Sequence, residues 1–60
     1  IINTAGVSEL MTLPGIGESR AHDIIRYRTE HGGFGCIEDI KKVSGIKDAA
    51  YSKIKDLIQV

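Results

Sequence analysis

The chain repeats itself at an offset of 30 residues, and no other feature of the sequence constrains its fold as strongly. The match includes apolar positions with helical spacing, a glycine-isoleucine pair and a later isoleucine. The aligned pairs are Val7 with Ile37, Leu10 with Ile40, Leu13 with Val43, Gly15-Ile16 with Gly45-Ile46, and Ile24 with Ile54, and the acids Glu9 and Asp39 also align. The two halves are therefore expected to be copies of one structural unit, separated at Gly32-Gly33.

Each copy is predicted to form a short helix, a glycine-containing turn and a longer helix. In the longer helix of the first copy, the residues at 21, 24, 25 and 28 follow the spacing i, i+3, i+4, i+7 that is typical of one packed helix face. No segment alternates convincingly with the period of two that indicates a strand. The short helices are predicted over 7–13 and 37–43, and the longer helices over 18–31 and 48–58.

Residues at the expected helix ends have the types that suit those positions. Gly6 and Cys36 stand just before the two short helices, at the N-cap positions. Gly32-Gly33 provides a residue for the left-handed conformation that commonly follows a helix. Asn3-Thr4 is expected to cap the chain and turn it into the first helix.

These elements predict an all-α fold of four main helices, in which two helix–turn–helix units are related by a pseudo-two-fold axis. A chain of 60 residues buries only about 60 % of its surface on folding, so the two units are expected to share one lean core. Arg28 lies on the apolar stripe, so its stem is expected to pack on the core while its charged end reaches solvent. The predicted core consists of Leu10, Leu13, Ile24, Phe34, Ile40, Val43, Ile54 and Leu57.

The composition is that of one folded domain over residues 1–60, and it excludes several classes of protein. Eight basic and eight acidic residues give a net charge of zero, which excludes a strongly basic nucleic-acid or membrane binder but allows a locally basic face. No segment approaches the roughly 20 apolar residues of a membrane span. The single cysteine, Cys36, cannot form an internal disulfide. Because the sequence does not begin with Met, we expect the domain to be a fragment of a longer protein.

The two turns are the segments with the clearest binding chemistry. Ile16 and Ile46 are expected to point into the core, which leaves backbone N–H groups of the turn and of the next helix's first turn facing outward. Such a cluster binds anions, and phosphate is the obvious anion. Ser19 and Arg20 lie beside it in the first copy. The alternative is a helix–helix turn that uses glycine only for its geometry; two copies at a fixed offset favour binding to the two strands of a duplex.

The segment Leu13-Pro14-Gly15-Ile16-Gly17, followed by Ala21 and Ile24, resembles the helix-hairpin-helix motif. The tandem arrangement is similar to the (HhH)2 domain, and the whole chain resembles the C-terminal DNA-binding domain of the ComEA family of bacterial competence proteins. The further matching segments are Ile2-Asn3-Thr4-Ala5, Ile25-x-Tyr27-Arg28, Gly33-Phe34, Ile37-Glu38-Asp39-Ile40 and Val43-x-Gly45-Ile46.

The resemblance implies non-sequence-specific binding of double-stranded DNA, through hairpin amides that contact phosphates across the minor groove. It also implies a role as a DNA receptor in transformation, in the periplasm or on the outer face of the membrane, with the parent protein anchored by a segment outside this sequence. The residues implied as DNA contacts are Gly15, Ile16, Gly17, Ser19 and Arg20 in the first copy, and Gly45, Ile46 and Lys47 in the second.

The second copy departs from the motif at three positions. Ser44 replaces the residue matching Pro14, Lys47 replaces the second glycine, and Asp48 follows it. If position 47 requires a positive φ, a lysine there costs about 1 kcal/mol of strain. An acid at the helix N-terminus also competes for the positive end of the dipole. The first hairpin is therefore expected to contribute more to binding.

Two other functions remain open from the sequence. The first is a protein–protein interaction domain of the same fold, which the zero net charge and Asp48 favour. The second is the DNA-targeting domain of a repair protein whose catalytic part is elsewhere. We find no paired carboxylates, catalytic triad or metal-ligand spacing, so no catalytic residue, small-molecule substrate, metal or cofactor is expected. Basic residues beyond the hairpins, namely Arg26, Arg28, Lys53 and Lys55, either line a DNA face or belong to solvated helix surfaces.

Overall fold

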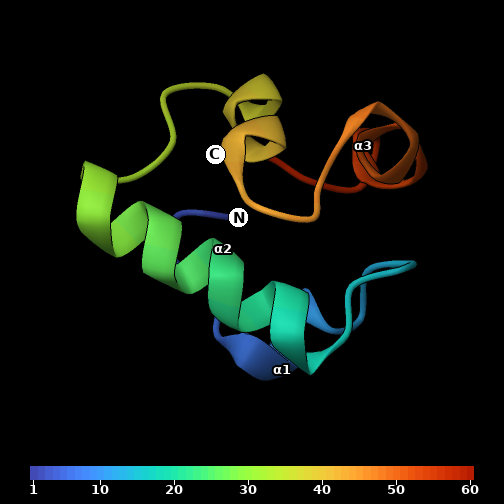
Figure 1. Cartoon of the computed structure of the whole chain (residues 1–60), viewed down its shortest axis with the longest axis horizontal. Coiled ribbons are helices and arrows are strands. Elements are labelled where there is room, and N and C mark those ends of the chain that lie inside the picture. Colours follow the sequence, from blue (N-terminus) through green and yellow to red (C-terminus); the bar gives the residue numbers. More distant parts are fainter.

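The computed structural model describes residues 1–60 and contains four helical elements and no strand. The all-α prediction is thereby confirmed. Figure 1 shows the first copy, with α1 and the long α2, on one side of the molecule and the second copy on the other. The elements are α1 (Val7–Leu10), α2 (Glu18–His31), the 3-10 helix η1 (Ile37–Lys42) and α3 (Asp48–Ile54).

Three of the helices are shorter or tighter than the sequence predicts. The helix expected over 7–13 ends at Leu10, because the amides of Thr12 and Leu13 donate to carbonyls only three residues back. The segment expected as an α-helix over 37–43 is a 3-10 helix, a form that is common in short pieces between turns. The helix expected to reach residue 58 ends at Ile54.

The predicted starts of the two short helices and the predicted end of α2 are confirmed. Gly6 and Cys36 occupy the N-cap positions of α1 and η1, both with extended backbone and without a side-chain cap. Gly32 follows α2 in the left-handed conformation, with φ of 75°. The next amide, that of Gly33, donates to the carbonyl of Arg28 at 2.8 Å and closes the end of the helix.

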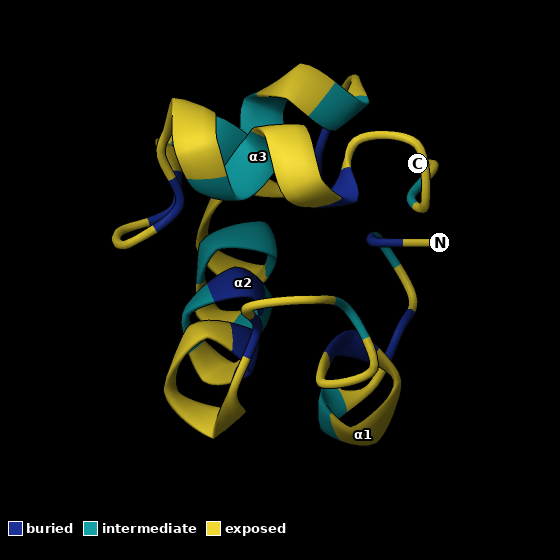
Figure 2. Cartoon of the chain, turned by 90° about the vertical axis from the view of Figure 1, so that its right-hand side faces the viewer, coloured by how far each residue is buried: buried dark blue, intermediate teal, exposed yellow.

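Both copies contribute buried residues to one core, and Figure 2 shows the buried segments in dark blue on both halves of the chain. Six of the eight predicted core residues are buried, and Leu13 lies half-buried against them. Leu57 is 61 % exposed, so its prediction is wrong. The reason is that α3 ends at Ile54, and the helical spacing that aligned Leu57 with the core ends there too. The buried residues not in that prediction are Ile2, Ala5, Ile16, Ala21 and Ile46.

The first five residues run between the two halves, as the position of the N-terminus in Figure 1 shows, and they are bound there by two polar side chains. The Asn3 amide pairs with the backbone of Phe34: its Oδ1 accepts from the Phe34 N–H at 2.7 Å, and its Nδ2 donates to the Phe34 carbonyl at 3.0 Å. Asn3 therefore joins the copies, where the sequence predicted a local cap.

Arg28 also acts differently from the expectation that its charged end reaches solvent. Its Nη1 donates to the carbonyls of Ile2, at 3.0 Å, and Ala5, at 2.6 Å. Both of these residues are buried, so the guanidinium supplies hydrogen bonds to backbone oxygens that water reaches poorly. A second contact, from the amide of Ile2 to the carbonyl of Gln59 at 2.8 Å, joins the two ends of the chain.

Candidate nucleic-acid interface

In each copy, one glycine-containing turn connects the two helices, and the two turns have the same conformation. We call residues 14–17 hairpin 1 and residues 44–47 hairpin 2. Gly15 has a φ of 78° and Gly45 a φ of 87°, which is the left-handed region that glycine adopts without strain. A Cβ on Gly15 would meet no atom within 4 Å, so the backbone conformation alone requires glycine there.

The isoleucines of both hairpins point into the core, as the sequence predicts. Ile16 is 4 % exposed and Ile46 is fully buried. Their amides are also used inside the turns, because Ile16 donates to the carbonyl of Leu13 and Ile46 to that of Val43, each at 3.1 Å. The unused amide donors are therefore those of Gly15 and Gly17 with the first turn of α2, and those of Gly45 and Lys47 with the first turn of α3.

The residue after each isoleucine has extended backbone, which corrects the expectation of strain at Lys47. Gly17 has a φ of −92° and Lys47 a φ of −112°, and any residue adopts such values without penalty. A Cβ on Gly17 would meet nothing within 4 Å. The strain argument for a weaker second hairpin is therefore wrong.

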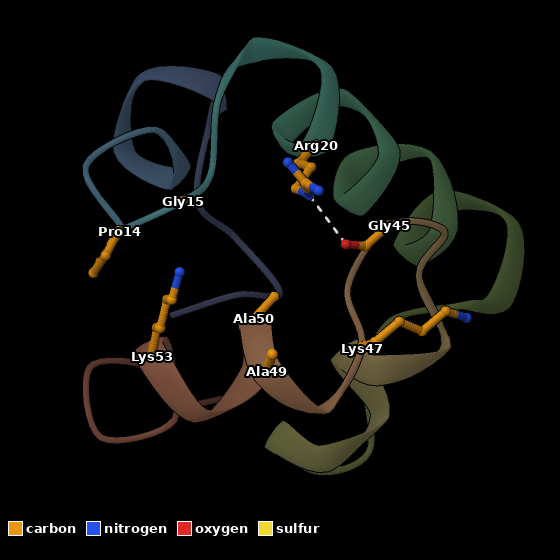
Figure 3. Close-up of a pocket in the computed structure, with 8 residues that line it drawn as sticks. All are labelled: Pro14, Gly15, Arg20, Gly45, Lys47, Ala49, Ala50 and Lys53. Carbon is orange, nitrogen blue, oxygen red and sulfur yellow. Dashed lines mark hydrogen bonds between the residues drawn. The ribbon is translucent and has the colours of Figure 1, made fainter.

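Arg20, in the first turn of α2 three residues after hairpin 1, connects the first copy to hairpin 2. Its Nε donates to the carbonyl oxygen of Gly45 at 3.0 Å, a contact drawn as the dashed line in Figure 3. A Cβ added to Gly45 would lie 3.4 Å from that Nε, which is an ordinary contact, so the positive φ is what favours glycine there. The two turns, 30 residues apart in the chain, are thus neighbours in space.

A pocket of about 350 Å³ lies between the hairpins (Figure 3). Three cationic side chains and no acidic one line it. In Figure 3, Arg20 and Lys53 point toward the pocket, whereas Lys47 extends away from it. The short side chains of Ala49 and Ala50 fill little of the pocket. The lining residues are Pro14, Gly15, Arg20, Gly45, Lys47, Ala49, Ala50 and Lys53.

From the sequence, Lys53 belongs either to a DNA face or to a solvated helix surface, and no binding motif includes Ala49 or Ala50. In the repeat, these positions align with Asp23, Ser19 and Arg20. At these three helix positions the second copy has two small alanines and a lysine where the first copy has a serine, an arginine and an aspartate. This difference in sequence is the signal that could have indicated an open, basic surface on the α3 side of the pocket. Ser19, a predicted contact, is exposed in the first turn of α2 beside hairpin 1.

Other charged residues form ion pairs away from the pocket. Arg26 pairs with Asp23 at 2.8 Å, and Lys42 pairs with Asp39 at 3.4 Å, which is the arrangement of a solvated helix surface. Desolvation alone would raise the pKa of Asp39, but the Lys42 ammonium and the Gly35 amide outweigh it and hold that pKa below its usual value.

The side chain of Asp48, a residue predicted from the sequence to be unfavourable for binding at hairpin 2, is almost fully exposed. Its carboxylate lies 3.5 Å from Nζ of Lys41, a residue of η1. Glu18 occupies the same helix position in the first copy. The two hairpins therefore each carry one acid at the start of the following helix, and this feature does not separate them.

No helix in the structure combines the length and the apolar character needed to cross a membrane.

The helix-hairpin-helix motif family matches residues 1–59 of the chain. Among curated proteins, ComE operon protein 1 of Bacillus subtilis (strain 168) is 52 % identical over 59 residues, which is 98 % of this chain and 29 % of that protein. Endonuclease/exonuclease/phosphatase family domain-containing protein 1 of Xenopus laevis is 46 % identical over 54 residues, which is 90 % of this chain and 10 % of that protein. The chain thus spans less than a third of each of these two relatives.

Proposed function

The chain belongs to the helix-hairpin-helix family, and from this premise we propose that it binds double-stranded DNA through the amides of both hairpins, without reading base sequence. The observation that carries the proposal is that both glycine turns line one pocket whose charged side chains are all cationic. Unused N–H groups beside such a cationic pocket are suited to phosphate oxygens. A net charge of zero is compatible with this function because three of the eight basic residues, and none of the acidic ones, line the pocket between the hairpins.

Of the residues that the sequence predicted as DNA contacts, six are proposed to contact or adjoin phosphates and two isoleucines are proposed to support the turns. Gly15, Gly17, Gly45 and Lys47 donate their unused amides to phosphates, while Ser19 and the charged side chains stand beside them. Ile16 and Ile46 have no amide left to donate, so they serve as apolar anchors that hold the turns in shape. The domain by itself is proposed to be a binding module without catalysis.

We extend the proposal to DNA uptake in competence, with the domain displayed outside the cytoplasm by a membrane anchor or held in the periplasm. The identity of 52 % to ComE operon protein 1 across almost the whole chain supports this assignment. It is a proposal about the parent protein, since the matched part is 29 % of that relative.

The second candidate is a DNA-targeting domain in a repair nuclease. It is favoured by the match to endonuclease/exonuclease/phosphatase family domain-containing protein 1, at 46 % identity in Xenopus laevis. Both candidates use the same DNA-binding surface and differ only in what is attached to it. A protein–protein interaction domain of this fold, the remaining alternative, would not bind a duplex.

Fluorescence anisotropy with a short labelled duplex tests the proposal. We expect binding that is competed equally by unlabelled random and AT-rich duplexes of the same length, because phosphate contacts carry no base information. Absence of binding at low salt would favour a protein–protein interaction domain. A difference of more than about tenfold between the competitors, equal to about 1.4 kcal/mol, would contradict recognition through phosphates alone.

A further inference from the structure

We propose that Arg20 is a positioning residue that fixes hairpin 2 relative to hairpin 1, so that the two hairpins bind a duplex as one rigid unit. The inference rests on the proposed function for its consequence in binding. Its structural basis is the hydrogen bond of 3.0 Å from Nε of Arg20, in the first copy, to the carbonyl of Gly45, in the second.

The bond acts on the peptide unit that determines the shape of hairpin 2. The N–H of that unit belongs to Ile46 and donates to the carbonyl of Val43 at 3.1 Å, while its carbonyl accepts from Arg20. The peptide plane is thus held at both ends. The next amide along the chain is that of Lys47, which has no partner in the protein. Arg20 therefore orients the segment that presents one of the proposed phosphate donors.

The pseudo-symmetry of the molecule shows that this contact is made only once. The residue that aligns with Arg20 in the second copy is Ala50, whose side chain has no donor. Correspondingly, the carbonyl of Gly15 accepts no hydrogen bond from the protein. Ala50 and Gly15 both line the pocket, so the pocket occupies the place where a second, symmetry-related bridge would lie. Arg20 is the one polar side chain of the first copy that forms a hydrogen bond with hairpin 2.

A fixed separation matters for binding because two linked sites bind more tightly when their spacing is already correct. Without the Arg20 bridge, hairpin 2 would have to be ordered on the DNA, and the entropy of ordering would reduce the affinity. This role differs from the phosphate contact that the sequence predicted for Arg20, in which the positive charge is what matters.

Two neutral substitutions of equal length separate these roles. In Arg20→Gln, the amide Nε2 stands the same number of bonds from Cα as the arginine Nε, so an N–H donor can still reach Gly45. In Arg20→Met, the chain has the same length and no donor. Both variants remove the charge, so any difference between them reports the hydrogen bond alone.

The first arm uses the free protein. At a temperature where circular dichroism shows equal helix content in all variants, ¹⁵N relaxation and amide exchange are measured for both hairpins. We expect Arg20→Met to increase mobility in residues 44–47 and leave residues 14–17 unchanged, with Arg20→Gln similar to wild type. Equal mobility of hairpin 2 in the Gln and Met variants would overturn the proposal, whatever the DNA results.

The second arm measures duplex affinity by anisotropy. We expect Arg20→Met to bind about three- to tenfold more weakly than Arg20→Gln, the range for one net hydrogen bond. Equal affinities would show that Arg20 acts through its charge alone and would overturn the proposal. A wild-type chain that binds no duplex would overturn the proposed function and the binding role of Arg20 with it, and the first arm would still report whether Arg20 orders the hairpin.

Discussion

Gly17 and Lys47 adopt the same extended backbone, with φ of −92° and −112° and ψ of −170° in both, although one is a glycine and the other carries a long side chain. Each follows an isoleucine that is buried in the core and precedes the first residue of a longer helix. In this chain, the turn therefore requires glycine before the isoleucine, at Gly15 and Gly45, whereas the position after the isoleucine accepts a side chain.

Gly15→Ala and Gly45→Ala are each expected to destabilise the protein by about 1 to 2 kcal/mol, because alanine is strained at a positive φ. Gly17→Ala is the matched control, with extended backbone and no atom within 4 Å of the added Cβ. Thermal denaturation followed by circular dichroism measures the difference. A Gly17→Ala variant as unstable as Gly15→Ala would contradict the conformations described for the two positions.

Hairpin 1 also offers a test of the proposed DNA-binding surface. A double variant with bulky residues at Gly15 and Gly17 is expected to abolish duplex binding, because the added side chains would cover the amides that donate to phosphate. The result counts only where circular dichroism shows intact helices. Full binding by such a folded variant would place the DNA surface elsewhere.

Lys47→Ala is expected to weaken duplex binding by about 1 kcal/mol, the scale of one surface phosphate contact, without a change in thermal stability. The control is Lys42→Ala, since Lys42 is also exposed but pairs with Asp39 and does not line the pocket. Anisotropy at one fixed salt concentration gives both values. A larger loss for Lys42→Ala would indicate that η1, and not hairpin 2, faces the DNA.

The dependence of affinity on salt is expected to be shallow, with a log–log slope of about −2 to −4. The reason is that three cations line the pocket between the hairpins, while the backbone donors are neutral and displace no counterions. Titrations over a series of salt concentrations measure the slope. A slope of about −8, which is typical of an extended basic groove, would show that most of the binding surface lies outside the hairpins.

Arg28→Met is expected to destabilise the fold by about 1 to 3 kcal/mol, because it removes the donors to the carbonyls of the buried residues Ile2 and Ala5. The control is Arg26→Met, two residues away on the same helix, which removes only an exposed ion pair with Asp23. Chemical denaturation measures the two effects. Equal stability of the two variants would show that these carbonyls do not need Arg28.

Local features of the sequence were sufficient to predict the fold class and the composition of the hairpins. The offset of 30 residues, the helical spacing of apolar positions and the glycine-isoleucine pairs predicted two copies of one unit with inward-pointing isoleucines. These features act within a few residues of one another, through backbone sterics and the burial of one helix face, so a linear pattern contains them. The site residues carried over by resemblance fall mostly on the two hairpins that meet at the pocket.

Contacts between distant residues were decided only by the tertiary structure. Asn3 joins Phe34 from 31 positions away, Arg28 joins Ala5 from 23, and Arg20 joins Gly45 from 25. A side chain with several donors has many backbone carbonyls within its reach, and which one it meets depends on how the two copies pack. The same packing buries Ile2 and leaves Leu57 exposed, because a residue's burial depends on what faces it once its helix has ended. The sequence by itself therefore determined the two hairpins, and the packing of the copies determined how they are held side by side.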